Sequence, residues 1–465
     1  MKKNYKKIYK QWPLMATVFV CIFYIVSRVW MYIRFGMAGF GYDIGIYRHI
    51  VQGYFDRLGD SALPSFGFTS FSNALSFLGS HTDTILVLWY LCFGILLMAA
   101  FYVVVNLYTK HKMIALIGLV LFATSIAQFE FFWWYYYRNL IALFFVLLSL
   151  ILLYYRSYFI ILSLFVIGTI HPLSLIPLGL VLIISSIFDR QKRSFLLVSG
   201  SVSLVGIIGL NFQEIMSYVS LLFEKTAHVS GASRQQNAEL TGQFIPLDFY
   251  IRSSFLYIIF AFFGLLFYWR LYKTWALFLV INTVLFIFGF LFYRRFLIYF
   301  DISALFFAAV FLYHFLYDSK DSILLKWTAI FFFALMFLQC GMHIVRKQPL
   351  ISPRELGAIQ AIDTQVPTSS YLMTINSHYA PWVQGFTTRD VIAPGMFEHD
   401  VWTYEEWQTF WYTEDISKRR ALLEKYGNAK ALYIFLGDRD MWFGDNIAYD
   451  PRISQVNNYI WQVSW

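Results

Sequence analysis

Cysteine is nearly absent from this chain, and the few copies lie where they build no disulfide framework. The 465 residues include three cysteines. Cys21, Cys92 and Cys340 each fall within a long apolar run. Small domains that depend on disulfides carry many cysteines in polar segments. The sequence therefore excludes a disulfide-stapled fold.

Charged residues are also scarce, which excludes an ordinary soluble protein. They make up 14% of the chain, whereas hydrophobic residues make up 59%. Soluble globular proteins average about 25% charged residues. The formal net charge is +9. The basic residues gather near the ends of apolar runs, so they indicate membrane topology and give no support for nucleic-acid binding.

Apolar runs of the length needed to cross a bilayer recur along most of the chain. We therefore predict a polytopic α-helical membrane protein with about eleven transmembrane helices. The fifth and sixth are short and separated only by His171 and Pro172, so they form either a tight hairpin or one broken segment. The expected spans are 13–35, 84–108, 112–129, 138–155, 157–170, 172–188, 194–210, 251–269, 274–292, 296–317 and 323–344.

Lysine and arginine near the span ends predict the orientation. The N-terminus, "MKKNYKKIYK", is strongly basic and should stay in the cytoplasm. An odd number of spans then places the C-terminal segment on the extracytoplasmic side. The expected localisation is a multi-pass protein of the cell membrane in contact with the lipid bilayer.

The domain organisation follows from these spans. Residues 1–345 form the transmembrane module, with a first outer loop at 36–83 and a second large outer loop at 211–249. Residues 346–465 form a small extracytoplasmic α/β domain, with strands in "SSYLMTIN" and "ALYIFLG". The stretch "DISKRRALLEKYG" predicts a helix closed by Gly427 as its C-terminal cap.

A helix is expected in the first outer loop, with Asp43 at its start. Apolar residues recur there at helical spacing, which is typical of a helix lying along the membrane surface. Aspartate is a favoured N-cap, so the plainest interpretation of Asp43 is a helix cap. A carboxylate at the lipid–water boundary can also serve as a general base. The apolar stripe is Tyr47, Ile50, Val51, Tyr54, Phe55 and Leu58.

Other polar residues are expected on the same side of the membrane. Arginines there are unexpected under the positive-inside rule, and a guanidinium is a good phosphate ligand. The plainest alternative is that each arginine reaches lipid head groups. His171, next to Pro172, has the alternative role of a helix-end histidine bonded to backbone. The candidate substrate-binding residues are Tyr47, Arg48, Glu130, Arg138, His171, Arg294 and Arg295.

Four stretches in the transmembrane module resemble the GT-C superfamily of integral-membrane glycosyltransferases, which includes protein O-mannosyltransferases, lipid A aminoarabinose transferases and oligosaccharyltransferase catalytic subunits. They are "GYDIGIYRHI", "YYRNLIALFF", "TIHPLSLIPLGL" and "YRRFLIYFDISALFFAA", and "YAPWVQGFTTRDVIAPG" is similar to outer-domain segments of bacterial members. The resemblance covers most of the chain in layout and short pieces in letters.

The resemblance implies transfer of a sugar from a polyprenyl-phosphate donor to an envelope glycan, lipid or protein acceptor, with inversion. Asp43 would take the family's first-loop acidic position as the catalytic base, and the arginines would hold the donor phosphate. Some members carry an Asp-x-Asp pair that binds a divalent cation. Here Gly45 stands two residues after Asp43. We therefore predict neither a metal nor another cofactor.

Two other classes of function fit parts of the pattern. A transporter or flippase for a lipid-linked or anionic substrate would explain arginines near spans, but it would predict charged residues near the bilayer midplane of repeated halves. A non-catalytic envelope assembly protein would leave Asp43 as a helix cap. If Asp43, Arg138 and Arg294 or Arg295 line one outward-facing cavity open to lipid, the transferase is favoured over both, and if they are scattered around the perimeter it is disfavoured.

Overall fold

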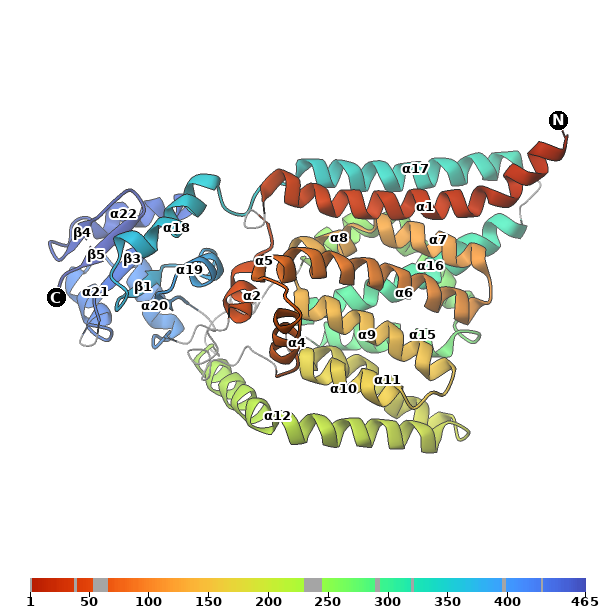
Figure 1. The fold of residues 1–465 in the computed structure, drawn as a ribbon, viewed down its shortest axis with the longest axis horizontal. Coiled ribbons are helices and arrows are strands. Elements are labelled where there is room, and N and C mark those ends of the chain that lie inside the picture. The colour runs from red at the N-terminus through yellow and green to blue at the C-terminus, as the bar shows by residue number, and fades with distance from the viewer. Residues whose placement is uncertain are drawn as a thin grey trace.

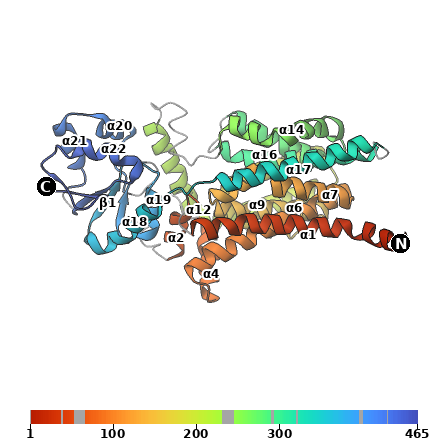
Figure 2. The ribbon, with the colours of Figure 1, turned by 90° about the horizontal axis from the view of Figure 1, so that it is seen from above.

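The computed structural model describes residues 2–36, 40–52, 66–229, 245–288, 293–318, 322–394, 399–427 and 430–465. The molecule is elongated, with a helical bundle at one end and a small α/β domain at the other (Figure 1). The N-terminus lies at the end of the bundle that is farthest from this domain (Figures 1 and 2). The chain is therefore a polytopic helical membrane protein with an appended C-terminal α/β domain, as predicted.

The bundle consists of apolar helices that run roughly side by side. Seven of the described helices are long and apolar enough to cross a membrane, and a bent pair, α7 and α8, supplies an eighth. Three shorter apolar helices fall on the remaining expected spans. The helices are α1 (Lys2–Phe35), α6 (Tyr90–Thr109), α7 (Lys112–Thr124), α8 (Ile126–Trp133), α9 (Tyr137–Tyr154), α10 (Ile160–Ile170), α11 (Pro172–Phe188), α12 (Arg193–Val229), α14 (Leu247–Tyr268), α15 (Lys273–Ile287), α16 (Phe296–Asp318) and α17 (Ile323–Arg346).

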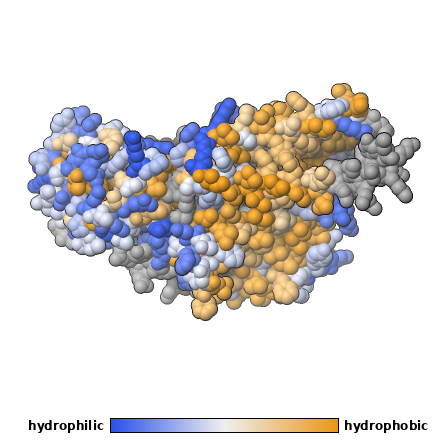
Figure 3. Space-filling view, turned by 45° about the horizontal axis from the view of Figure 1, so that its top comes forward, coloured by the Kyte–Doolittle hydropathy of each residue, from blue (hydrophilic) through white to orange (hydrophobic). Residues whose placement is uncertain are grey.

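Burial differs among these helices according to their place in the bundle. Helix α16 is the core helix, with 83% of its span buried, and α14, α15 and α7 pack around it. Helix α17 lies beside α1 at the edge, with 11% of its span buried (Figures 1 and 2). Exposed leucine, isoleucine and phenylalanine side chains cover the bundle, whereas the far end of the molecule is polar (Figure 3). Such a band is the surface that a hydrocarbon layer covers.

Two expected loops are partly helical. Helix α12 continues to Val229, which is nineteen residues into the expected loop at 211–249, and α14 starts at Leu247. In the first loop the structure has α2 (Ile44–Val51), α4 (Phe66–Phe77), α5 (Thr82–Thr84) and the π-helical turn η1 (Ile85–Trp89), and a short 3-10 turn, η2 (Tyr293–Arg295), precedes α16.

Helix α2 confirms the first part of the stripe predicted for the first loop. Tyr47 and Ile50 are buried. The rest of the stripe, Tyr54, Phe55 and Leu58, lies outside the described residues. The predicted placement along the membrane surface stays a prediction, and α2 packs against α19 of the C-terminal domain (Figure 1).

The C-terminal domain has a five-stranded sheet in the order β2-β1-β3-β5-β4. The two predicted strands are confirmed as β1 and β3, which pair in parallel, with β2 parallel to β1 and β5 antiparallel to β3. The elements are α18 (Pro353–Gln365), β1 (Tyr371–Thr374), α19 (Ala380–Phe386), β2 (Asp390–Ile392), α20 (Tyr404–Tyr412), α21 (Ile416–Leu423), β3 (Leu432–Phe435), η3 (Asp438–Asp440), α22 (Met441–Ile447), β4 (Ile453–Gln455) and β5 (Ile460–Val463).

The predicted helix in this domain is present, but its end differs from the prediction. Helix α21 begins after Asp415, whose side chain accepts hydrogen bonds from the backbone N–H groups of Ser417 and Lys418. Its C-cap is Glu424 and not Gly427. Gly427 instead packs against the ring of Trp465, where an added Cβ would lie 2.6 Å from a ring carbon. The glycine is needed for this packing and not for helix termination.

Candidate functional site

Asp43 lies in the turn between α1 and α2, and the turn is held against the bundle by an aromatic anchor and a glycine. Phe40 is fully buried and its ring stacks 5.7 Å from that of Trp133. Gly41 has a φ of +81°, and a Cβ there would lie 2.6 Å from the Cβ of Tyr135. Only glycine fits both the backbone conformation and the contact. The chain preceding Asp43 is therefore placed on the turn between α8 and α9.

The carboxylate of Asp43 is not used as a helix cap. Asp43 occupies the N-cap position of α2, but its side chain makes no capping hydrogen bond. Its backbone carbonyl accepts from the N–H of Tyr47 at 3.1 Å. The cap interpretation thus accounts for the position of the residue but leaves the carboxylate available for another task.

Two arginines from distant parts of the chain act on Asp43. Burial raises the pKa of the Asp43 carboxyl to about 6, while the charges of Arg295 and Arg138 oppose the rise. Arg138 lies in the first turn of α9, and Arg295 ends η2 just before α16. Both helices start at the end of the bundle that faces the C-terminal domain. The carboxylate thus lies within electrostatic reach of two guanidinium groups, at the ends of three apolar segments.

Contacts with neighbouring elements orient both arginines. The Nε atom of Arg138 donates to the carbonyl oxygen of Ile170 at 2.9 Å, at the end of α10. The guanidinium of Arg295 lies over the ring of Tyr136, 4.9 Å from its centroid. Such cation–π contact and backbone hydrogen bonding restrict a long side chain. The two cations are held by fixed partners and do not extend freely into solvent.

Tyr47 and His171 complete the group of predicted residues that the structure brings together. The hydroxyl of Tyr47 accepts from the backbone N–H of Arg138 at 3.4 Å. Burial raises the pKa of Tyr47 to about 12, so the phenol stays protonated at neutral pH. His171 lies 2.7 Å from the hydroxyl of Ser174, and both arginine charges act on its ring.

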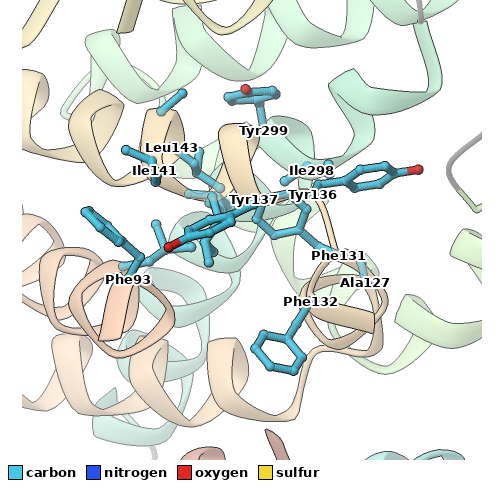
Figure 4. Close-up of a cluster of buried hydrophobic side chains, with 14 of the residues drawn as sticks. Phe93, Ala127, Phe131, Phe132, Tyr136, Tyr137, Ile141, Leu143, Ile298 and Tyr299 are labelled. Atoms are coloured by element: carbon cyan, nitrogen blue, oxygen red, sulfur yellow. The ribbon is translucent and has the colours of Figure 1, made fainter. Parts of the chain in front are cut away.

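Two tyrosines beside this cluster were not among the predicted residues. The hydroxyl of Tyr299 forms a hydrogen bond with the hydroxyl of Ser174, and the charge of Arg295 acts on Tyr299. Tyr136 lies under Arg295, and Figure 4 shows both tyrosines near the buried cluster around Tyr137. Signals for both exist in the sequence. Tyr136 belongs to the aromatic run before Arg138, and Tyr299 lies one helical turn after Arg295.

The other three predicted substrate ligands have different surroundings. Glu130, on α8, is buried and pairs with Lys347 and with His343 near the end of α17. Arg48 donates from Nη1 to the carbonyl of Gly385 in the C-terminal domain at 2.7 Å. Arg294 shares η2 with Arg295 and is half-buried. A substrate role for these three stays a prediction, and the contacts of Glu130 and Arg48 favour structural roles.

The cluster has the parts needed for displacement at a phosphate-linked carbon. The carboxylate can accept a proton, and planar guanidinium groups suit a leaving phosphate. Within the described ranges, no group of three or more His, Cys, Asp or Glu side chains is arranged to hold a metal ion. Gly45 itself has no room for a side chain, because a Cβ would lie 1.7 Å from the carbonyl oxygen of Pro381.

Comparison with known proteins finds a match in structure and none in sequence. No protein-family model matches the chain, and no curated protein matches its sequence. Among solved structures, the fold is similar to that of the Archaeoglobus fulgidus oligosaccharyltransferase, crystallised in complex with Zn and sulfate, with a TM-score of 0.64. The likeness covers 90% of this chain and 68% of that protein at 13% sequence identity. The chain thus has the GT-C-like fold that the sequence resemblance implied.

Proposed function

We propose that this chain is an inverting membrane glycosyltransferase that moves a sugar from a polyprenyl-phosphate donor to an acceptor of the cell envelope. The observation that carries the proposal is the convergence of Asp43 with Arg138 and Arg295 at the membrane-boundary end of the bundle. A donor anchored by a lipid tail presents its phosphate and sugar at this depth. The similarity of fold to an oligosaccharyltransferase supports the same reaction class.

In the proposed reaction, Asp43 takes the proton of the acceptor hydroxyl or amine. The freed electron pair forms a bond to the anomeric carbon of the sugar as the bond from that carbon to the phosphate oxygen breaks. The leaving electron pair stays on polyprenyl phosphate, whose charge Arg138 and Arg295 stabilise. A single displacement inverts the configuration at the anomeric carbon. The raised pKa of Asp43 suits a base, because proton transfer is efficient when the pKa lies near the working pH.

The proposed orientation has the N-terminus in the cytoplasm and the C-terminal domain outside. The basic N-terminal segment supports it. The N-terminus and the C-terminal domain also lie at opposite ends of the bundle (Figure 1), as an odd number of crossings requires. The Asp43 cluster then faces the extracytoplasmic side, where envelope acceptors are found.

A flippase fits this arrangement less well. Transporters bind their substrates near the bilayer midplane, at broken helices. Asp43, Arg138 and Arg295 instead lie where helices begin or end at one face of the bundle. A non-catalytic assembly protein would leave unexplained why the charges of two arginines act on the carboxylate of Asp43, which makes no cap bond.

The test is Asp43→Asn in purified protein reconstituted in lipid, with a panel of polyprenyl-phosphate sugars and labelled envelope acceptors. The Asp43 side chain makes no capping hydrogen bond, and asparagine has nearly the same shape, so the fold should survive. It accepts no proton at neutral pH, so transfer should fall by about 10²–10⁴. A variant that unfolds at the wild-type temperature and transfers sugar at a near-normal rate would refute the catalytic role.

A further inference from the structure

The chain segment that carries Asp43 is clamped by the C-terminal domain, at a backbone contact that two glycines make. A Cβ on Gly45 would lie 1.7 Å from the carbonyl oxygen of Pro381, and a Cβ on Gly385 would lie 2.3 Å from the carbonyl oxygen of Gly45. Each glycine therefore makes room for the backbone of the other helix. Such close approach between helices is open only to glycine.

Polar and aromatic contacts surround this glycine pair on both sides. The hydroxyl of Tyr42 donates to the carbonyl of Ser377, just before α19. One turn further along α2, Arg48 donates to the carbonyl of Gly385 and lies 4.6 Å from the ring centroid of Phe386. The residues immediately before and shortly after Asp43 thus bind the C-terminal domain.

Helix α2 depends on these contacts for its place. It has eight residues, and isolated helices shorter than about 12 residues are marginal in water. The bundle touches it from one side, through Tyr47 and the turn that carries Arg138. Helix α19 touches it from the other. Removing the second contact would leave the Asp43 turn held from one side only.

We propose that α19 of the C-terminal domain is a fixed wall of the Asp43 site, with Gly45 and Arg48 as positioning residues that set the carboxylate against Arg138 and Arg295. This inference rests on the proposed function, because it assigns the role of the domain in that reaction. It also gives Arg48 a different task from the phosphate ligand that the sequence predicted. The C-terminal domain is then part of the active site and not an independent appendage.

Gly45→Ala tests the clamp directly. The added methyl group forces α2 and α19 apart by more than about 1 Å, and misplacement of that size costs about 10²-fold in rate. The matched control is Gly357→Ala in α18 of the same domain, where a Cβ would meet nothing within 4 Å. We expect a loss of kcat of about 10²-fold for Gly45→Ala with little change in the donor KM, and wild-type kinetics for Gly357→Ala.

The pH profile separates positioning from partial unfolding. Burial is the main cause of the raised pKa of Asp43, so moving α19 away should lower that pKa and extend activity to lower pH. A smaller folded fraction would lower the rate by the same factor at every pH and would leave the acid limb of the rate-against-pH profile in place. Arg48→Ala should behave as a weaker Gly45→Ala. A large rise in donor KM for Arg48→Ala would instead make it a phosphate ligand and overturn its positioning role.

Hydrogen exchange measured by mass spectrometry reports the contact between α2 and α19 without any assay of activity. Gly45→Ala should speed exchange in peptides spanning 44–52 and 380–386, and Gly357→Ala should not. Two results for Gly45→Ala would overturn the inference. One is unchanged exchange, and the other is faster exchange in a protein that turns over as fast as Gly357→Ala. Full transfer by Asp43→Asn would refute the proposed function instead, and the exchange result would still decide whether α19 clamps α2.

Discussion

Ser125, at the bend between α7 and α8, donates a hydrogen bond to Asp301 in the second turn of α16, with an oxygen–oxygen distance of 2.9 Å. The axes of α7 and α8 differ in direction by 50° at this bend. The Ser125 side chain also caps α8 by accepting a hydrogen bond from the backbone N–H of Gln128. Asp301 accepts three further bonds, from the amide of Gln128 and from the hydroxyls of Tyr250 and Tyr257. A fully buried carboxylate is thus satisfied by four neutral donors.

This carboxylate connects the elements that carry the two site arginines. Helix α8 leads into the turn before Arg138, and α16 begins directly after Arg295. A buried carboxylate that accepts from side chains of several helices restricts how those helices pack. Asp301, which the sequence marks only as an acid inside a span, therefore holds the bend of the bundle behind the site.

Asp301→Leu should destabilise the protein strongly. The substitution removes the acceptor of four buried donors, and each buried group left without a partner costs about 1–3 kcal/mol. We expect a clear loss of thermal stability in lipid nanodiscs and weaker donor binding. The control is Ser303→Ala in the same helix, which loses one bond to the carbonyl of Tyr299 and should stay close to wild type. Equal melting temperatures for the two variants would contradict the role of Asp301.

The two arginines should control the pH dependence of transfer. The reaction needs ionised Asp43, so activity should fall as the pH drops through its pKa of about 6. Arg295 and Arg138 favour the ionised form and lower this pKa. Arg295→Gln or Arg138→Gln should therefore move the acid limb to higher pH, in addition to slowing turnover.

Arg294→Gln provides the matched control for this shift. Arg294 neighbours Arg295 on η2, whereas the two cations that act on Asp43 are Arg295 and Arg138. Its acid limb should stay at the wild-type position in the same rate-against-pH measurement. An acid limb that moves in none of the three variants would mean that Asp43 is not the titrating base.

The ion pair of Glu130 with Lys347 should stabilise the junction between the bundle and the C-terminal domain. Glu130 is almost fully buried, and Lys347 directly follows α17. Lys347→Met leaves a buried carboxylate with His343 as its remaining partner, and breaking a buried pair costs about 3–5 kcal/mol. Thermal unfolding should show a large loss for Lys347→Met and a smaller one for the double variant with Glu130→Gln.

The same variants decide between this role and the substrate role that the sequence predicted for Glu130. A structural ion pair predicts that Glu130→Gln, once folded, binds the donor with normal affinity. Donor binding that is lost in a fully stable Glu130→Gln protein would return Glu130 to the substrate site.

Hydropathy predicted the bundle well for a physical reason. In hydrocarbon, every backbone polar group needs an internal partner, so an apolar run of sufficient length becomes a helix. Charge placement was predictable for Arg138 and Arg295, because both begin apolar segments on the same side. The bend at Ser125 was not, since a serine within an apolar run carries no strong signal for a break.

The roles of Arg48 and Glu130 depend on contacts that local sequence does not reveal. Arg48 follows Asp43 by five residues, which places both in one loop, but its partner Gly385 lies 337 residues further along the chain. Glu130 and Arg138 flank one aromatic run, yet the turn at Tyr135, with a φ of 64°, intervenes between them. In the sequence, Gly45 indicates only that a second carboxylate is absent, whereas the contact with Pro381 shows that a side chain at this position has no room.

Membrane topology gives the last prediction. A reporter that is active only in the cytoplasm, fused after Trp465, should be silent, because the basic N-terminus and the opposite placement of the C-terminal domain put that domain outside (Figure 1). The same reporter inserted at the short turn between α6 and α7, near Lys110, should be active, since this basic turn lies one crossing away from the Asp43 end. A second reporter, active only outside, should give the reverse pattern. If the cytoplasmic reporter were active after Trp465 and silent at Lys110, the protein would have the opposite topology. Asp43 would then face cytoplasmic and not envelope acceptors.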